Sequence, residues 1–139
     1  TMNLVTYWAL MDEGREFGLS QDNWEKVSVV LDGGMTALER AYRGGVNLCY
    51  GTDLLGGMQR HQSKEFAIRA EIVPTIDTIR SATSTAARLI QREGELGVIV
   101  PGAHGDLIVL DRDPLHDVSV LADAPPRVVV QAGRIVAGG

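Results

Sequence analysis

The run Val46-Asn47-Leu48-Cys49-Tyr50-Gly51-Thr52-Asp53 is apolar at first and ends in a glycine, a hydroxyl side chain and a carboxylate. Gly44-Gly45 precedes it and Gly56-Gly57 follows it, so the pattern predicts a short buried β-strand bounded by turns. Asp53 would then stand at the carboxyl end of that strand, where α/β proteins bind ligands. The alternative is that Asp53 caps a turn or the next helix, as aspartate often does.

The residues before this run predict a strand and a helix. Met2–Leu10 has the β-branched and aromatic content of a strand. Beyond Asn23, a candidate N-cap, apolar residues recur at steps of three and four, which predicts an amphipathic helix. We expect an interruption at Gly33-Gly34 and an end at Gly44-Gly45.

Strand, helix and strand in this order form a βαβ unit with parallel strands and a right-handed crossover. Both strands would end at the same face, which would bring Thr6, Tyr7 and Trp8 toward the opening that holds Asp53. Packing in the core is the alternative role of Tyr7 and Trp8.

Two further helices are expected after Asp53. His61–Glu71 has apolar residues on one side and charges on the other, and His61 would begin that helix. After a break at Val73-Pro74, Thr75 or Asp77 would begin another helix that continues to Ile90.

From Gly94 onward, short β runs replace the helices. Leu96–Asp111 predicts two short strands around a Pro-Gly turn, and Arg127–Val136 predicts a hairpin that turns near Ala132-Gly133. We therefore divide the chain into residues 1–95 and residues 96–139. A segment of about 40 residues is too small to build its own core, so the second part must complete a sheet begun elsewhere.

Composition excludes several classes of protein. The 139 residues carry 13 basic and 18 acidic side chains, a net charge of −5, without a basic cluster, which argues against a nucleic-acid or anionic-membrane partner. No run approaches the ~20 apolar residues of a membrane span, and the first residues do not resemble a signal peptide. The compartment is unknown from these residues, with a cytoplasmic location favoured. The single cysteine, Cys49, lies in the apolar run, where a small buried hydrophobe is its usual role.

Four motifs in order resemble the C-terminal third of the amidohydrolase superfamily, in the branch of imidazolonepropionase-like enzymes and Xaa-Pro dipeptidases (prolidases). The first is Gly45-Val46 leading into Gly51-Thr52-Asp53, which is similar to the family's sequence at the eighth barrel strand. The others are Ile79–Ala87, Gly97–Asp111 with Asp113-Pro114-Leu115, and Ala132–Val136. Gly105 departs from the family's usual alanine, which we interpret as a local backbone matter. The narrower prolidase assignment rests on Leu54–Glu71.

The resemblance implies an α/β fold: the last two βα units of a (β/α)₈ TIM-type barrel in residues 1–95, and C-terminal strands of a small composite β-sandwich in residues 96–139. It also implies a binuclear divalent metal site, usually zinc. Asp53 is the one position here that matches the family's ligands, and His61, His104 and His116 form no His-x-His pair. The remaining ligands and barrel strands one to six would belong to an N-terminal part on a separate or missing chain. His104 and His116 are expected to be exposed turn residues.

The chemistry so implied is hydrolysis of an amide or peptide bond by metal-activated water, with Asp53 accepting the proton and passing it to the leaving nitrogen. Thr6, Tyr7, Arg60 and His61 are the candidates for the near wall of the substrate pocket. A small peptide or amide is the expected substrate, and a homo-oligomer is the expected assembly. Alone, the chain should neither bind two metals tightly nor hydrolyse an amide.

Two alternatives remain open at the level of the sequence. One is a non-catalytic module whose exposed sheet edge docks a partner chain. The other is a cyclic-amide hydrolase of the imidazolone type. A dipeptidase or carboxypeptidase is favoured over both.

Overall fold

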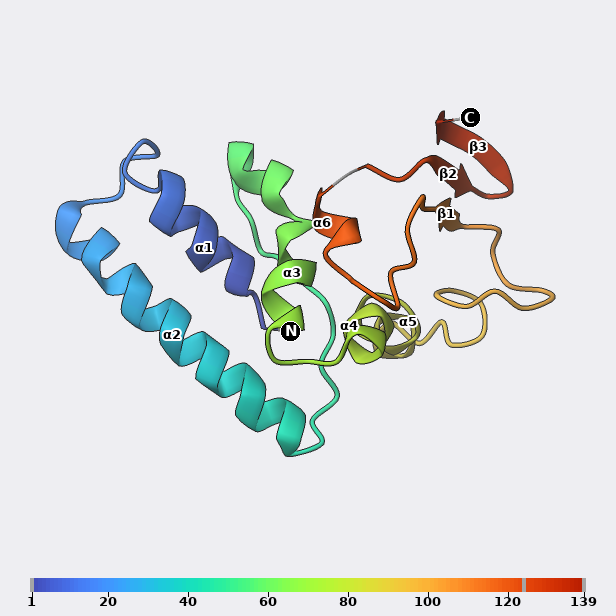
Figure 1. The fold of residues 1–139 in the computed structure, drawn as a ribbon, viewed down its shortest axis with the longest axis horizontal. Helices are drawn as coiled ribbons and strands as arrows, with labels where there is room; N and C mark the ends of the chain where they lie inside the picture. The colour runs from blue at the N-terminus through green and yellow to red at the C-terminus, as the bar shows by residue number, and fades with distance from the viewer. Residues whose placement is uncertain (1, 124, 139) are drawn as a thin grey trace.

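The computed structural model describes residues 2–123 and 125–138, with helices at one end of the molecule and a small sheet at the other (Figure 1). Among these residues, none of the helices has the length and apolar character required to cross a membrane. The helices are α1 (Leu4–Glu13), α2 (Gln21–Arg43), the 3₁₀-helix η1 (Gly56–His61), α3 (Lys64–Ala70), α4 (Thr75–Ala82), α5 (Ser84–Leu89) and α6 (Val120–Asp123). The strands are β1 (Leu107–Val109), β2 (Val128–Gln131) and β3 (Arg134–Gly138).

The long helix α2 confirms the amphipathic pattern but begins earlier than predicted. Its N-cap is Ser20, whose hydroxyl accepts a hydrogen bond from the backbone N–H of Asn23 (3.4 Å), so the predicted cap at Asn23 is wrong. The helix runs through Gly33-Gly34 without interruption and ends at Gly44, as expected. Because it packs along α1, tertiary contact outweighs the low helix propensity of the two glycines.

The predicted strand at Met2–Leu10 is wrong, because this segment forms helix α1. Leu4, Val5 and Ala9 are the buried residues of this helix. Their residue types are compatible with a strand, but their spacing is equally compatible with a helix. Leu4 packs with Leu38 and Val73, whereas Val5 and Ala9 pack with Leu54 and Met58. Burial on two sides therefore decides in favour of the helix.

A buried ion pair on α3 holds the start of α1. Glu65 and Arg69 are both almost fully buried, and Arg69 Nε donates to Glu65 Oε1 at 2.7 Å. Glu65 Oε2 accepts from the N–H of Val5 (2.7 Å), in the first turn of α1. Burial raises the pKa of the Glu65 carboxyl, and the hydrogen bonds from Val5 and Arg69 act in the opposite direction. The guanidinium also donates to the carbonyls of Met2 (2.6 Å) and Cys49 (3.0 Å).

The run at residues 46–53 is not a strand in this structure, so the predicted βαβ unit is also wrong. It lies between α2 and η1 and pairs with no strand in residues 2–123 and 125–138. Its backbone is held by other bonds: the N–H of Tyr50 donates to the carbonyl of Ser81 (2.9 Å), and the carbonyl of Cys49 accepts from Arg69. An extended segment that pairs with no strand must satisfy its backbone N–H and C=O groups with other polar groups nearby.

The helices after Asp53 are shorter than expected. The predicted helix His61–Glu71 is two elements, and His61 ends η1 instead of beginning α3. The predicted helix from Thr75 does begin there, but it breaks at Thr83, whose φ of −121° and ψ of −100° separate α4 from α5.

Beyond α5, the strands form one antiparallel sheet in the order β1-β2-β3 (Figure 1). The hairpin prediction is confirmed, with the turn at Ala132-Gly133 between β2 and β3. Of the two strands predicted in Leu96–Asp111, only β1 forms. The fold is thus a set of helices with a small antiparallel sheet.

Removing the buried charge of Glu65 should destabilise the protein far more than removing an exposed one. Glu65→Gln leaves Arg69 buried without a counter-charge, so we expect a loss of about 3 kcal/mol in the free energy of unfolding. Glu39→Gln is the matched control, because Glu39 and Arg43 have the same i,i+4 spacing (2.8 Å) but are exposed. It should cost about 0.5 kcal/mol or less. Urea unfolding followed by tryptophan fluorescence measures both, and equal losses would contradict the structural role of the buried pair.

Gly97 should not tolerate a side chain. Its φ is +69°, and a Cβ there would lie 2.5 Å from the carbonyl carbon of Thr83, at the break between α4 and α5. Gly94 also has a positive φ (+81°) but has open space around it. Gly94→Ala should cost about 1 kcal/mol from backbone strain alone, and Gly97→Ala about 1–3 kcal/mol more from the clash. Similar unfolding midpoints for the two variants would show that residues 97 and 83 do not touch.

Candidate functional site

Asp53 is exposed and has a φ of +51°, in the left-handed region that residues other than glycine seldom adopt. The carbonyl of the residue before it, Thr52, accepts a hydrogen bond from the hydroxyl of Thr6 on α1. Leu54, directly after it, is buried against Val5. Asp53 therefore projects from a turn whose two flanking residues are both fixed to α1.

The loop after Asp53 returns to α1 at the helix's other end. Glu13 contacts both Arg60 and His61 at the end of η1: its Oε2 accepts from the Arg60 guanidinium, and its Oε1 lies 2.7 Å from His61 Nε2. The His61 hydrogen bond is the main cause that lowers the pKa of Glu13, with Arg60 adding to it. Since an ionised carboxylate only accepts hydrogen bonds, His61 must carry a proton on Nε2.

Aromatic and cationic side chains surround this ion pair. The Trp8 and His61 rings meet edge to face, with centroids 5.3 Å apart, and the Lys64 ammonium lies 5.6 Å from the centroid of the Trp8 ring. The end of η1 thus gathers the Glu13 carboxylate, three basic groups and an indole, about two turns of α1 away from Thr6, which contacts the turn at Asp53.

Three of the four predicted wall residues make contacts between α1 and residues 52–61, at two places about two helical turns apart. Thr6 lies beside the Asp53 turn, and Arg60 and His61 share Glu13. Tyr7 is 36% exposed on the same helix. Sequence reasoning missed Glu13, because the predicted strand ended at Leu10 and left Glu13 in a loop. In the helix that forms instead, Glu13 lies about two turns after Thr6 on the same side.

Asp53 is the candidate metal ligand in this chain. Within residues 2–123 and 125–138, no group of three or more His, Cys, Asp or Glu side chains could hold a metal ion. An exposed carboxylate on a fixed turn fits a single ligand position, which other residues would have to complete. The chain can thus supply one ligand and the support for it.

The remaining candidates behave as buried or surface residues. Cys49 is buried, with its sulfur 3.6 Å from the carbonyl of Thr85, which agrees with a packing role. His104 and His116 are exposed, as expected, and His104 Nε2 lies 3.2 Å from the Arg92 guanidinium.

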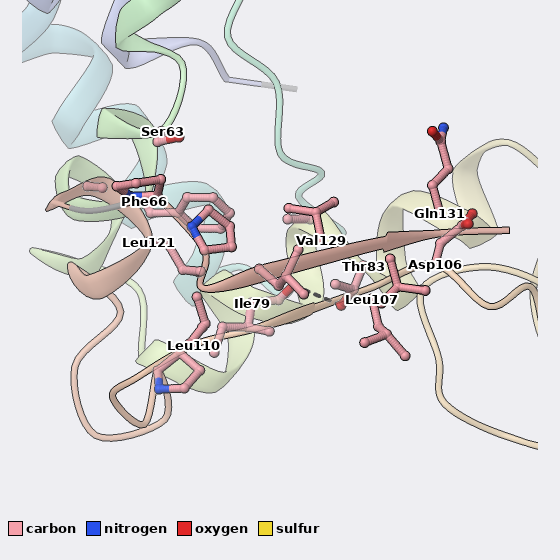
Figure 2. A pocket seen from close by; sticks show the side chains of 18 of the residues that line it. Ser63, Phe66, Ile79, Thr83, Asp106, Leu107, Leu110, Leu121, Val129 and Gln131 are labelled. Carbon is pink, nitrogen blue, oxygen red and sulfur yellow. Dashed lines mark hydrogen bonds between the residues drawn. The ribbon is translucent and has the colours of Figure 1, made fainter. Parts of the chain in front are cut away.

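A separate cavity of about 1130 Å³ lies between the sheet and the helices. Figure 2 shows Ile79 and Thr83 of the α4–α5 region, Phe66 of α3 and Leu121 of α6 around the strands. Most of its lining is apolar, and Arg60 and Ser63 reach its edge, whereas Asp53 is not among the described residues that line it. Arg60, in η1, therefore belongs both to the Glu13 cluster and to the lining of this cavity.

Comparison with known proteins places the chain in a family. The model of the amidohydrolase family matches residues 11–136. The chain belongs to the amidohydrolase family. A solved prolidase in complex with N-methylphosphonate-L-proline is 44% identical, with a TM-score of 0.91 over 99% of this chain and 34% of that one.

Two curated relatives are named for reactions other than dipeptide cleavage. Ochratoxinase from Aspergillus niger is 26% identical over 84% of this chain and 24% of its own length. A 5-methylthioadenosine/S-adenosylhomocysteine deaminase from Symbiobacterium thermophilum is 34% identical over 76% of this chain and 29% of its own length. The chain therefore spans about a quarter of the curated relatives and about a third of the prolidase.

The pKa of Glu13 should depend on His61. His61→Phe keeps a ring against Trp8 but removes the hydrogen bond that lowers the Glu13 pKa, so this pKa should rise toward its ordinary value. A carboxyl whose pKa is lowered in the folded state stabilises that state above its unfolded pKa and loses this contribution as the pH falls through its folded pKa. As the pH is lowered, the contact between α1 and η1 should therefore weaken at a higher pH in His61→Phe than in the wild type. A carbon-13 NMR titration of Glu13 measures the shift, with His104→Phe as the control that should leave it unchanged.

Proposed function

We propose that this chain is the C-terminal part of a metal-dependent amidohydrolase that cleaves dipeptides with a C-terminal proline, with Asp53 as a metal ligand and proton shuttle. The observation that carries the proposal is the 44% identity to a prolidase over 99% of the chain. That prolidase was solved with a phosphonate of proline.

Asp53 has the chemistry for both tasks. Its carboxylate is a hard oxygen ligand of the kind that divalent zinc accepts, and it is exposed on a turn held by α1. A bound divalent metal would acidify water and polarise the scissile carbonyl. Asp53 Oδ would take up the proton lost by the attacking water and deliver it to the leaving nitrogen, the tertiary-amide nitrogen of proline.

The remaining wall residues suit a small charged substrate. Tyr7 is 36% exposed on α1, and Arg60, whose guanidinium has more N–H groups than Glu13 and Gly57 use, lies beside His61 at the end of η1. A dipeptide carries a C-terminal carboxylate, which cationic N–H donors bind through charge-assisted hydrogen bonds. Glu13 neutralises part of the positive charge of Arg60. Lys64, whose ammonium lies 5.6 Å from the centroid of the Trp8 ring, is a further positive group near His61.

The proposal is favoured over a non-catalytic docking module, over a cyclic-amide hydrolase of the imidazolone type, and over a deaminase. A family match over residues 11–136 does not favour a non-catalytic docking module. The 34% identity to a deaminase over 76% of the chain supports a second candidate, a hydrolytic deaminase that releases ammonia. The two reactions give different products, proline or ammonia, from different substrates.

Asp53→Asn tests the proposal in the full-length protein supplied with zinc. The amide keeps the size of the side chain but cannot take up the proton, so turnover of Xaa-Pro dipeptides should fall about 10²–10⁴-fold. Zinc content by metal analysis should also fall, and the circular dichroism spectrum should not change. Asp32→Asn, at an exposed position on α2, is the control and should retain wild-type turnover.

The substrate panel decides between the candidates. It contains Xaa-Pro dipeptides, dipeptides without proline, and S-adenosylhomocysteine. Release of proline without release of ammonia is the expected result. Ammonia from S-adenosylhomocysteine as the dominant product would favour the deaminase, and full turnover by Asp53→Asn would contradict the proton-shuttle role.

A further inference from the structure

Helix α1 holds the loop between residues 52 and 61 at both ends. Thr6 donates from its hydroxyl to the carbonyl of Thr52, directly before Asp53. Glu13 binds Arg60 and His61, where the loop ends in η1. Thr6 and Glu13 are seven residues apart, which is about two turns, so they project from the same side of the helix.

We infer that α1 is a clamp and that Thr6 and Glu13 are positioning residues that fix the direction of the Asp53 carboxylate. The catalytic half of this inference rests on the proposed function of Asp53. It assigns a role to Glu13, and it gives Thr6 a structural task in place of direct contact with substrate.

The geometry at Thr52 explains how a hydroxyl on α1 can orient the next side chain. The peptide bond between Thr52 and Asp53 is planar, so a hydrogen bond that fixes the Thr52 carbonyl also fixes the Asp53 nitrogen. Asp53 adopts a φ of +51°, which costs about 1–2 kcal/mol relative to the right-handed region. Without the bond from Thr6, this peptide is free to rotate and to relieve the strain, and the carboxylate would swing with it.

The hydroxyl of Thr6 is already used in this bond. A threonine hydroxyl has one proton to donate, and here it goes to Thr52. Thr6 is half-buried, which suits a fixed contact between α1 and the loop. Its value to the site is therefore the placement of Asp53.

Apolar contacts also hold the middle of this loop against α1. Leu54 and Met58 are buried in one cluster with Val5 and Ala9 of α1. The helix therefore contacts the loop by a hydroxyl, an apolar strip and a carboxylate in succession. Contacts with a rigid helix fix the position of a catalytic side chain more precisely than a free loop can. Such precision matters because misplacement by 1 Å can cost about 10²-fold in rate.

The first test measures the clamp without reference to activity. Amide hydrogen exchange of the peptide covering Gly51–His61 is followed by mass spectrometry in the full-length protein. Thr6→Val keeps the shape but removes the hydroxyl, and Glu13→Gln removes the charge that binds Arg60. Exchange should rise about tenfold in each variant. Thr6→Ser keeps the hydroxyl and should restore wild-type exchange.

Matched controls exclude a general loss of stability. Thr36→Val removes a threonine hydroxyl on α2 that bonds the carbonyl of Asp32 (3.1 Å), and Glu16→Gln removes an exposed charge close to the end of α1. Neither should change exchange in Gly51–His61. Unchanged exchange in Thr6→Val and Glu13→Gln would overturn the clamp, whatever the protein catalyses.

The second test connects the clamp to Asp53 through steady-state kinetics with an Xaa-Pro dipeptide. Thr6→Val should lower kcat about 10²-fold with KM within about threefold of wild type, and Thr6→Ser should recover most of kcat. Faster exchange with an unchanged kcat would overturn the positioning role. A wild-type protein that does not turn over any Xaa-Pro dipeptide would refute the proposed function, while the exchange result would still decide the clamp.

Discussion

The buried ion pair between Glu65 and Arg69 is the interaction on which the helical part of the protein depends. Two charges are removed from water, a large cost that only close partners offset. The partners come from three segments: the first turn of α1 at Val5, the chain before it at Met2, and the extended run at Cys49. One side-chain pair on α3 therefore joins the beginning of the chain to the run that leads to Asp53.

This arrangement also explains why α1 is a helix. The first N–H groups of a helix have no partner within it, and α1 has no side-chain cap of its own at Asn3. The Glu65 carboxylate supplies both an acceptor for Val5 and the negative charge that a helix N-terminus favours. With that end satisfied and one face buried against α2 and α3, the helix is stable although its residues have the composition of a strand.

Residues 52–63 contribute both to the candidate site and to the apolar cavity. Near Asp53, the loop residues are tied to α1 by Thr6 and Glu13. Toward the sheet, Arg60 and Ser63 reach the edge of a cavity with mainly apolar lining (Figure 2). The polar contacts orient specific side chains, whereas the apolar lining of the cavity gives no directional preference.

The sequence alone determined the family motifs, the long helix α2 and the hairpin at Ala132-Gly133, because these depend on local periodicity, turn glycines and residue order. It also proposed Asp53 as a candidate ligand. The tertiary structure decided the rest. It made residues 4–13 a helix, left residues 46–53 without a strand partner in the described residues, and brought Glu13 to His61. The physical reason is that a cap, a ladder partner and an ion pair each come from residues distant in the chain, and no local pattern records them.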